Sequence, residues 1–284
     1  MTRPRAGTFI DVYRDRATAI RHFTSLVGSL PASIDAVAAD PTAPSLGELV
    51  TLIGATVAPH EVDVEATLAR FDGIAAAVGE QTVDGVRRRL FDDLGFAGNS
   101  ADYYSLDNSR LDLVVDRRVG IPITLGIVMV EVGRRVGVPL HLCALPGHVV
   151  VGDGARRWYD AFDGGRPMDA HDCQELVSNI DLRLRITESD LEPTPPQSIL
   201  IRVLNNMVAV ASRDHHDLVY PLLQLRSALP DMSPRERVLL GRGHAEAGDV
   251  VAASDQLEAA AAMLDGDDAR SLEAEAARYL ARLN

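Results

Sequence analysis

Two neighbouring stretches decide the fold: GIPITLGIVMVEVGRRVGVP at residues 120–139 and LPGHVVVGDGARRWYDAFDGG at residues 145–165. The first predicts a buried helix that begins near Pro122, because a proline in the first helical turn lacks only an N–H that would have no partner there. The second predicts an antiparallel hairpin. Its strands, over residues 138–151 and 156–162, are rich in Val, Leu, Trp and Tyr, and the glycine-rich turn GDGAR joins them.

This hairpin places one histidine and one aspartate together. If the chain turns about Gly154, His148 and Asp160 lie equally far from the turn and face each other across the strand pair, about 5 Å apart at Cβ. Val150 and Trp158 share that face. An aspartate in this position fixes the tautomer of the imidazole and stabilises its charged form. A polar pair that is simply satisfied within an apolar layer has the same pattern, so a structural and a functional interpretation of His148 both remain.

Helices dominate on both sides of these stretches. Residues 8–97 show apolar positions at intervals of three and four, and Ser45 and Glu48 have the spacing of a capping box. The segment SDLEPTPPQS, residues 189–198, indicates a linker, because three prolines within four residues break any helix. Beyond it, residues 197–284 predict helix pairs with the period of tetratricopeptide repeats, about 34 residues, and a last helix that caps the stack. An unrelated helical bundle is the alternative.

Composition excludes several classes of partner. The chain of 284 residues has a net charge of −13 and contains no lysine, which argues against nucleic acids and anionic membranes as partners. Its two cysteines, Cys143 and Cys173, are too few for a disulfide framework and predict free thiols in a reducing compartment. The N-terminus lacks a signal-peptide pattern, and no apolar run reaches the length of a membrane span. We therefore expect a cytoplasmic protein.

Four segments between residues 95 and 148, GFAGN, NSRL, RRVGIPITL and PGH, together resemble the SirB-type branch of the transglutaminase-like superfamily. The resemblance covers nearly the whole chain and implies a bacterial protein of the α+β class. The transglutaminase-like domain would span residues 1–192, with helices over 1–97 and a papain-like core with an antiparallel sheet over 98–192. An all-α tetratricopeptide-like tail over 197–284 would follow.

The resemblance also implies a candidate site. In active members of the wider superfamily, a cysteine opens the central helix, and a histidine and an aspartate lie on neighbouring strands. Position by position, this puts Thr124 at the cysteine site, His148 at the histidine site and Asp160 at the aspartate site. The resemblance implies that the SirB-type branch commonly carries a serine or a threonine at this position. A hydroxyl is far harder to ionise than a thiol, and the extra methyl group crowds the approach of a substrate. Thr124 therefore either caps its helix or acts as an unusual nucleophile.

Three further side chains are expected to line the cleft, and each has a structural alternative. Asn108 lines the cleft or closes a turn, Cys143 is a second nucleophile or a small buried apolar group, and Trp158 is a substrate platform or part of the core. Arg117 and Arg118 predict salt bridges with nearby acids or, as the alternative, contacts with an anionic ligand. The remaining histidines show no metal-ligand spacing, so we expect neither a metal nor another cofactor.

Two functions remain, and they differ in whether Thr124 reacts. The favoured one is a non-catalytic or weakly catalytic protein, a pseudoenzyme, that binds a protein or peptide in the groove of its helical repeats, around Asn205 and Asn206. The alternative is an enzyme of acyl transfer or amide hydrolysis, with Thr124 as nucleophile, His148 as base and Asp160 orienting it. A hydrogen bond between the Thr124 hydroxyl and His148 would favour the enzyme.

Overall fold

A computed structural model describes residue 13, residues 15–30 and residues 43–283 of the chain. The chain forms two compact units, Met1–Val203 and Leu204–Asn284. The division falls inside a helix, a few residues beyond the proline-rich segment at which the sequence predicts a linker. The beginning of the helix that the sequence predicts from residue 8 lies outside the described residues.

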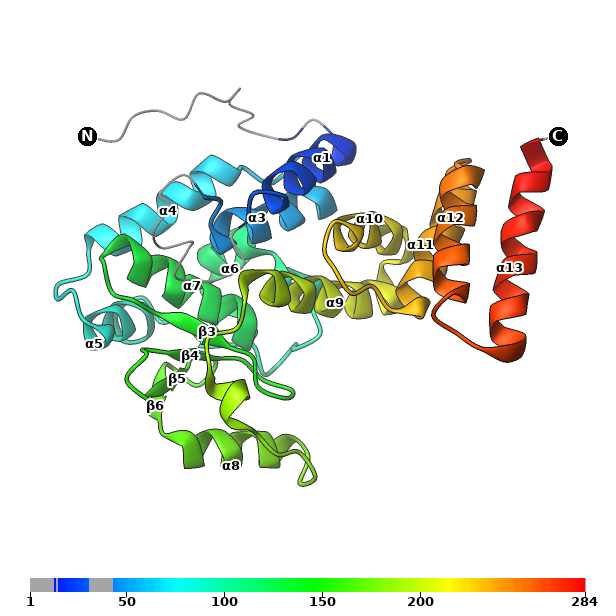
Figure 1. The fold of residues 1–284 in the computed structure, drawn as a ribbon. Coiled ribbons are helices and arrows are strands. Elements are labelled where there is room, and N and C mark those ends of the chain that lie inside the picture. Colours follow the sequence, from blue (N-terminus) through cyan, green and yellow to red (C-terminus); the bar gives the residue numbers. More distant parts are fainter. Residues whose placement is uncertain (1–12, 14, 31–42, 284) are drawn as a thin grey trace. The chain divides into compact units, whose positions relative to one another are not determined.

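The first half of the first unit is helical, as predicted (Figure 1). Each helix described in this half follows a residue whose side chain accepts a hydrogen bond from the amide three positions later, which satisfies one of the unpaired donors of the first turn. These capping residues are Asp15, Ser45, Asp63 and Thr82. The helices are α1 (Arg16–Val27), α3 (Leu46–Val57), α4 (Val64–Ala76) and α5 (Val83–Arg87), the last continuing into the π-helical turn η1 (Arg88–Asp93).

Short elements connect these helices to the centre of the unit. A two-residue parallel bridge pairs Ala97 with Val119 and Gly98 with Gly120, so it joins the two ends of the polar loop and the short helix between them. The elements are β1 (Ala97–Gly98), η2 (Leu106–Ser109), α6 (Leu111–Arg117) and β2 (Val119–Gly120).

The central helix is α7 (Pro122–Arg135), which begins at the predicted proline and is buried along most of its length. A four-stranded sheet packs against it. Gly126 permits the close approach, because a Cβ at this position would lie 2.7 Å from Cδ2 of Leu142 on the sheet. The helix therefore positions the strands that carry the candidate site.

The sheet is antiparallel and has the strand order β3–β4–β5–β6. The single strand predicted over residues 138–151 is wrong, because a turn at Pro146 and Gly147 divides it; Pro146 has no amide N–H to give a ladder, and Gly147 has a φ of 76°. The predicted hairpin is present, but Gly152 pairs with Trp158, so the chain turns about Ala155 and not about Gly154. The strands are β3 (His141–Cys143), β4 (Val150–Gly152), β5 (Trp158–Asp160) and β6 (Arg166–Met168).

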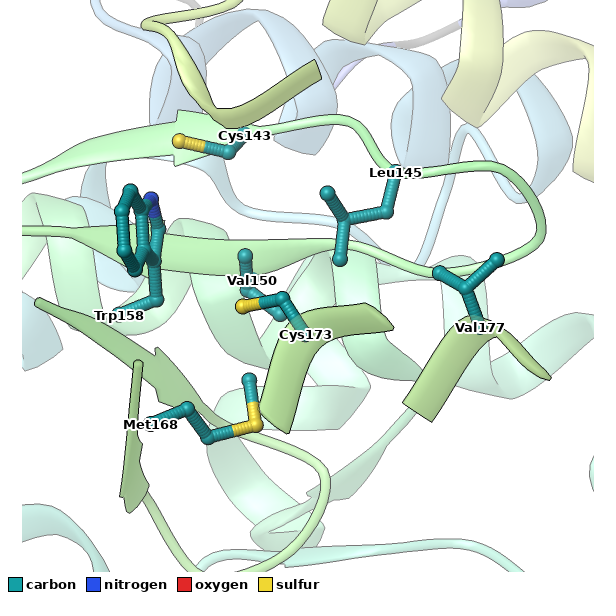
Figure 2. Packing of buried hydrophobic residues seen from close by; sticks show 7 residues of the cluster. All are labelled: Cys143, Leu145, Val150, Trp158, Met168, Cys173 and Val177. Carbon is teal, nitrogen blue, oxygen red and sulfur yellow. The ribbon is translucent and has the colours of Figure 1, made fainter. Parts of the chain in front are cut away.

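The outer face of the sheet is covered by α8 (Ala170–Ile180), a helix that the sequence analysis did not predict. Its Cys173 and Val177 pack into an apolar cluster with residues of the strands and of the turn between β3 and β4 (Figure 2). The cluster comprises Cys143, Leu145, Val150, Trp158, Met168, Cys173 and Val177. The turn η3 (Glu188–Leu191) follows α8.

The proline-rich segment lies along the edge strand β3. The amide of Thr194 donates to the carbonyl of Leu142 at 2.8 Å, and the Thr194 hydroxyl accepts from the amide of Ala144 at 2.9 Å. A segment predicted as a linker is thus hydrogen-bonded to the sheet.

The second unit is helical, as the sequence predicts. Helix α12 packs against both α11 and α13. The buried guanidinium of Arg226 pairs with Glu236 at 3.1 Å and donates to three backbone carbonyls, so its charge and most of its donors have partners. The elements from the end of the first unit onward are α9 (Pro196–Asp214), α10 (His216–Ser227), α11 (Pro234–Glu246), α12 (Val250–Ala261), α13 (Gly266–Leu280) and η4 (Ala281–Leu283). Among the described residues, no helix is both long enough and apolar enough to cross a membrane.

Candidate functional site

Thr124 lies in the first turn of α7 and is completely buried. Its hydroxyl donates to the carbonyl of Asn108 at 2.8 Å and accepts from the amide of Ile121 at 3.1 Å. Ile121 is the N-cap of the helix and has no polar side chain, so Thr124 satisfies the N-cap amide from inside the helix. The hydroxyl proton is therefore committed to a backbone carbonyl.

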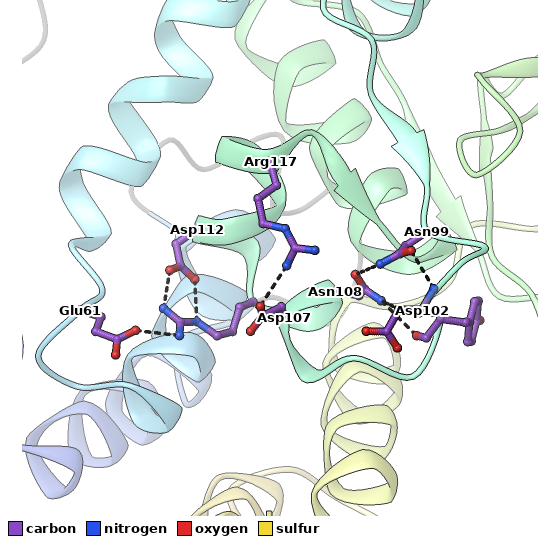
Figure 3. Close-up of polar contacts among 9 residues, drawn as sticks. Glu61, Asn99, Asp102, Asp107, Asn108, Asp112 and Arg117 are labelled. Carbon is purple, nitrogen blue, oxygen red and sulfur yellow. Dashed lines mark hydrogen bonds and ion pairs between the residues drawn. The ribbon is translucent and has the colours of Figure 1, made fainter. Parts of the chain in front are cut away.

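Asn108, which receives this bond, closes the polar loop before α6. Its amide nitrogen donates to the carbonyls of Asp102 and Tyr103 at 2.7 and 3.1 Å, and its amide oxygen accepts from Asn99 at 2.9 Å (Figure 3). The side chain is completely buried. The structure therefore matches the turn-closing alternative for Asn108, because no polar atom of the side chain is left for a ligand.

His148 and Asp160 are in direct contact. The Nε2 atom of His148 lies 3.0 Å from Oδ1 of Asp160, and both side chains are buried. The same Asp160 oxygen accepts from the amide of Phe162 at 3.0 Å, which fixes the carboxylate against its own strand end. Within the described residues, Nδ1 of His148 makes no hydrogen bond and remains available for one.

The expected contact is formed, but the expected register is wrong. The pairing of Gly152 with Trp158, carried two residues further, places Val150 opposite Asp160, so His148 reaches the carboxylate diagonally from the turn before β4. Long side chains span such a diagonal, which explains how the pair forms without direct opposition.

The structure does not join Thr124 to this pair. In the part of the chain that the structure describes, the Thr124 hydroxyl bonds only to Asn108 and Ile121, and His148 bonds through its side chain only to Asp160. The three positions named from the resemblance thus form a pair and a separate buried threonine.

The thiol of Cys143 is buried in the apolar cluster below the sheet's outer helix. Burial raises the pKa of its thiol from 9.0 to about 12, and Sγ donates to the carbonyl of Leu191 at 3.2 Å. Burial likewise raises the pKa of the Cys173 thiol to about 12. Both thiols are therefore protonated at neutral pH, and the thiolate is the nucleophilic form.

Trp158 lies in the same apolar cluster and is 5% exposed. Its indole N–H donates to the carbonyl of Leu191 at 3.2 Å. This is the arrangement of a core tryptophan and not of a platform that is open to substrate.

Sequence reasoning missed the aromatic side chains beside His148. The ring of Phe162 meets the His148 ring edge to face, with centroids 6.3 Å apart, and Tyr103 meets Phe162 at 5.9 Å. Tyr103 and Tyr104 are 39% and 64% exposed, so the polar loop carries aromatic surface next to the pair. The adjacent residues YY in the loop were the available signal.

Charged side chains support the loop from its other end. Arg110 donates to Asp112 at 2.8 Å and to Glu61 at 2.9 Å, and Arg117 pairs with Asp107 at 3.0 Å (Figure 3). The salt-bridge alternative for Arg117 is thus the observed one. Arg110 belongs to the quoted segment NSRL, but its partners lie on other elements and could not be read from that segment.

Among the described residues, no group of three or more His, Cys, Asp or Glu side chains is placed to hold a metal ion.

Comparison with known proteins finds one matching superfamily and several relatives that match part of the chain. The pattern of the transglutaminase-like superfamily matches residues 57–205. A UPF0162 protein of Xylella fastidiosa (strain 9a5c) is 39% identical over 132 residues, which cover 44% of this chain and 47% of the relative. F-box only protein 21 of Mus musculus is 28% identical over 155 residues, which cover 51% of this chain and 24% of the relative. The chain thus spans about half the length of the UPF0162 relative.

Proposed function

The chain belongs to the transglutaminase-like superfamily, and from this premise we propose that it is a SirB-type pseudoenzyme that binds a protein or peptide as a regulatory module. In this proposal Thr124, at the superfamily's nucleophile position, stabilises the fold, and the surface around His148 binds the partner.

The observation that carries the proposal is the hydrogen bond from the Thr124 hydroxyl to the Asn108 carbonyl, in a side chain with no exposed surface. A hydroxyl nucleophile needs a base within hydrogen-bond reach of its proton and an open path to the substrate. The buried hydroxyl meets neither condition. A backbone carbonyl holds the proton, and it is far too weak a base to remove it.

The surface beside the His148–Asp160 pair has features of a binding site. Exposed tyrosines are enriched at interfaces, because the ring is apolar and the hydroxyl can still form hydrogen bonds. Tyr103 and Tyr104 meet each other edge to face at 5.3 Å. A peptide that stacks on these rings can also accept or donate a hydrogen bond at Nδ1 of His148.

The helices of the second unit supply the other proposed contact. Tetratricopeptide repeats bind extended segments along the helices that line their inner face. The packing of α12 against both α11 and α13 supports a stacked helical repeat. Asn205 is exposed and Asn206 half-buried on α9, where amide side chains can bond to the backbone of a bound peptide.

Two further parts of the proposal concern the setting of the protein. The two cysteines are free, which supports a reducing, cytoplasmic location. The UPF0162 relatives are bacterial, which supports a bacterial origin.

The enzyme with a Thr124–His148–Asp160 triad is the second candidate. The contact of His148 with Asp160 favours it, because an aspartate that orients a histidine is part of many acyl-transfer sites. It would need a rearrangement that frees Thr124 from Asn108.

Acyl labelling tests the proposal directly. The wild-type protein is incubated with p-nitrophenyl acetate, and its peptides are mapped by mass spectrometry, with Thr124→Ser as a matched variant that keeps the hydroxyl. We expect no acetyl group on residue 124 in either protein. An acetylated Thr124 would overturn the pseudoenzyme.

A peptide-binding experiment tests the proposed recognition of a peptide by the helices of the second unit. An immobilised peptide library is probed with the wild type, with the double variant Asn205→Ala/Asn206→Ala, and with Ser212→Ala as the control on the same helix. Ser212 is exposed, and its hydroxyl donates to the carbonyl of Val208 in its own helix. Loss of binding in the double variant alone supports the groove, and equal binding by all three proteins contradicts it.

A further inference from the structure

A cavity of about 310 Å³ lies in the first unit, where α4, η1 and α6 meet. None of its lining residues belongs to the site described above. The lining residues are Arg70, Gly73, Ile74, Arg89, Leu94, Phe96, Val115, Asp116 and Arg118. Helices α4 and α6, which supply part of this lining, pack against each other.

The charge of this cavity is opposite to that of the chain. Three arginines and one aspartate line it, so its formal charge is +2 in a chain with a net charge of −13. The arginines come from three separate elements, α4, η1 and the end of α6. Like charges brought together repel each other, and an anion among them removes that repulsion.

Two of the three guanidinium groups, those of Arg89 and Arg118, have N–H donors without a hydrogen-bond partner among the described residues. Arg118 gives one N–H to the carbonyl of Leu94 at 2.9 Å and pairs with no carboxylate among the described residues. Arg89 lies 3.5 Å from Asp93, and its Nε is buried without a hydrogen-bond partner. Buried donors are rarely left without a partner, so this N–H is an unusual feature of Arg89. Arg70 already pairs with Asp116 at 3.0 Å.

The backbone at Arg118 adds an independent observation. This residue ends α6 in the left-handed region, with φ 58° and ψ 29°. Glycine is the usual residue at such a helix end, because a side chain makes the conformation costly. Arginine in the place of glycine is a local strain of the kind that is found at functional sites.

The rest of the lining is apolar. Ile74, Leu94, Phe96 and Val115 contribute aliphatic and aromatic side chains. The volume is at the lower end of the range for small-molecule sites, about 300–1,000 Å³. An occupant that matches both parts of the lining has one anionic group and a compact apolar body.

We propose that this cavity binds a small organic anion, whose carboxylate or phosphate group is held by Arg89 and Arg118 and whose apolar body lies against Phe96 and Val115. Guanidinium groups suit both anions, because their paired N–H groups match two oxygens at once. This site goes beyond the proposed function, and its existence does not depend on it.

Isothermal titration calorimetry of the full chain with phenyl phosphate, benzoate and inorganic phosphate tests the proposal. We expect phenyl phosphate, benzoate or both to bind at least tenfold more tightly than inorganic phosphate. Binding of phenyl phosphate alone identifies a phosphate ester as the ligand, and binding of benzoate alone identifies a carboxylate; either result supports the site.

Three variants locate the binding. Arg118→Gly removes the guanidinium and places the residue best suited to the left-handed backbone, so we expect at least tenfold weaker binding and an unchanged or higher melting temperature. Arg89→Gln should weaken binding to a similar extent. Arg117→Gln is the matched control, because Arg117 adjoins Arg118 but pairs with Asp107 and does not line the cavity. Its affinity should change less than twofold.

Three results would overturn the proposal. They are no detectable binding of either organic anion by the wild type, unchanged affinity in Arg118→Gly and Arg89→Gln, and inorganic phosphate that binds as tightly as phenyl phosphate.

Discussion

Replacing Thr124 by valine tests whether the hydroxyl is structural. Valine keeps the shape of threonine but removes the group that bonds the Asn108 carbonyl and the Ile121 amide. A buried polar group without a partner costs about 1–3 kcal/mol, so the two groups together cost about 2–6 kcal/mol. Burying an additional methyl group returns about 1 kcal/mol. We therefore expect Thr124→Val to lower the free energy of unfolding by about 3 kcal/mol.

Urea unfolding of the first unit measures this difference in the free energy of unfolding. The chain has one tryptophan, Trp158, which is buried in the first unit, so its fluorescence reports the unfolding of that unit. With a urea dependence of about 2 kcal/mol per M, the midpoint should fall by about 1.5 M.

Thr124→Ser is the matched control. It keeps both hydrogen bonds and loses one buried methyl group, which costs about 1 kcal/mol. Its midpoint should fall by only about 0.5 M. A catalytic residue shows the reverse behaviour, since its replacement often leaves stability unchanged or raises it. A Thr124→Val protein as stable as the wild type would therefore refute the structural assignment.

Three further predictions concern packing and charge. Cys143 and Cys173 should resist iodoacetamide at pH 8 in the folded protein and react in urea. Burial raises the pKa of both thiols from 9.0 to about 12, so their contribution to stability is complete below about pH 9 and is lost as the pH rises toward 12. Thermal melts across that pH range measure this loss. Gly126→Ala should destabilise the first unit by about 1–3 kcal/mol through overpacking, whereas Gly73→Ala, in a helix with open space around it, should stabilise it by about 0.5–1 kcal/mol, as read from urea midpoints. Arg226→Met should destabilise the second unit by about 3–5 kcal/mol, because Glu236 loses its buried partner; a helical melting curve unchanged by the substitution would contradict this.

The hairpin shows how far sequence reasoning reaches. Its centre was predicted at Gly154 and lies at Ala155, which moves the residue opposite Asp160 from His148 to Val150. Since side chains alternate along a strand, a shift of two residues leaves them on the same face. The face was therefore predictable even though the register was not.

The register depends on a local hydrogen bond that the glycine pattern does not reveal. The carboxylate of Asp153 accepts from the amides of Ala155 and Arg157, and Arg156 adopts a φ of 59°. Residues 153–157 lie between the paired Gly152 and Trp158, two residues more than in a turn centred on Gly154. Helix α8 was missed for a different reason. The sequence signal of its start is the capping box formed by Asp169 and Asp172, and this pair lies in a short polar stretch that resembles a loop.

The hydrogen-bond partners of Asn108 and the arginine cavity were beyond the sequence. Asn108 bonds to backbone carbonyls, which every residue has, so no side-chain pattern indicates its partners. The cavity combines residues 70, 89 and 118, which only the packing of three elements brings together. Local periodicity predicts elements and faces, whereas sites assembled from several elements require the fold.

The hydrogen bonds of Thr194 to β3 have a consequence for solubility. An edge strand with free amides and carbonyls is a template onto which another chain can add, and natural proteins protect such edges. The segment around Thr194 occupies part of this edge, and its prolines have no N–H with which to extend a ladder to a further strand. A fragment that ended at residue 192, just before this segment, would keep the sheet but lose the segment that covers its edge strand. Aggregation of such a fragment would then follow from an uncovered edge and not from a failure of the core to fold.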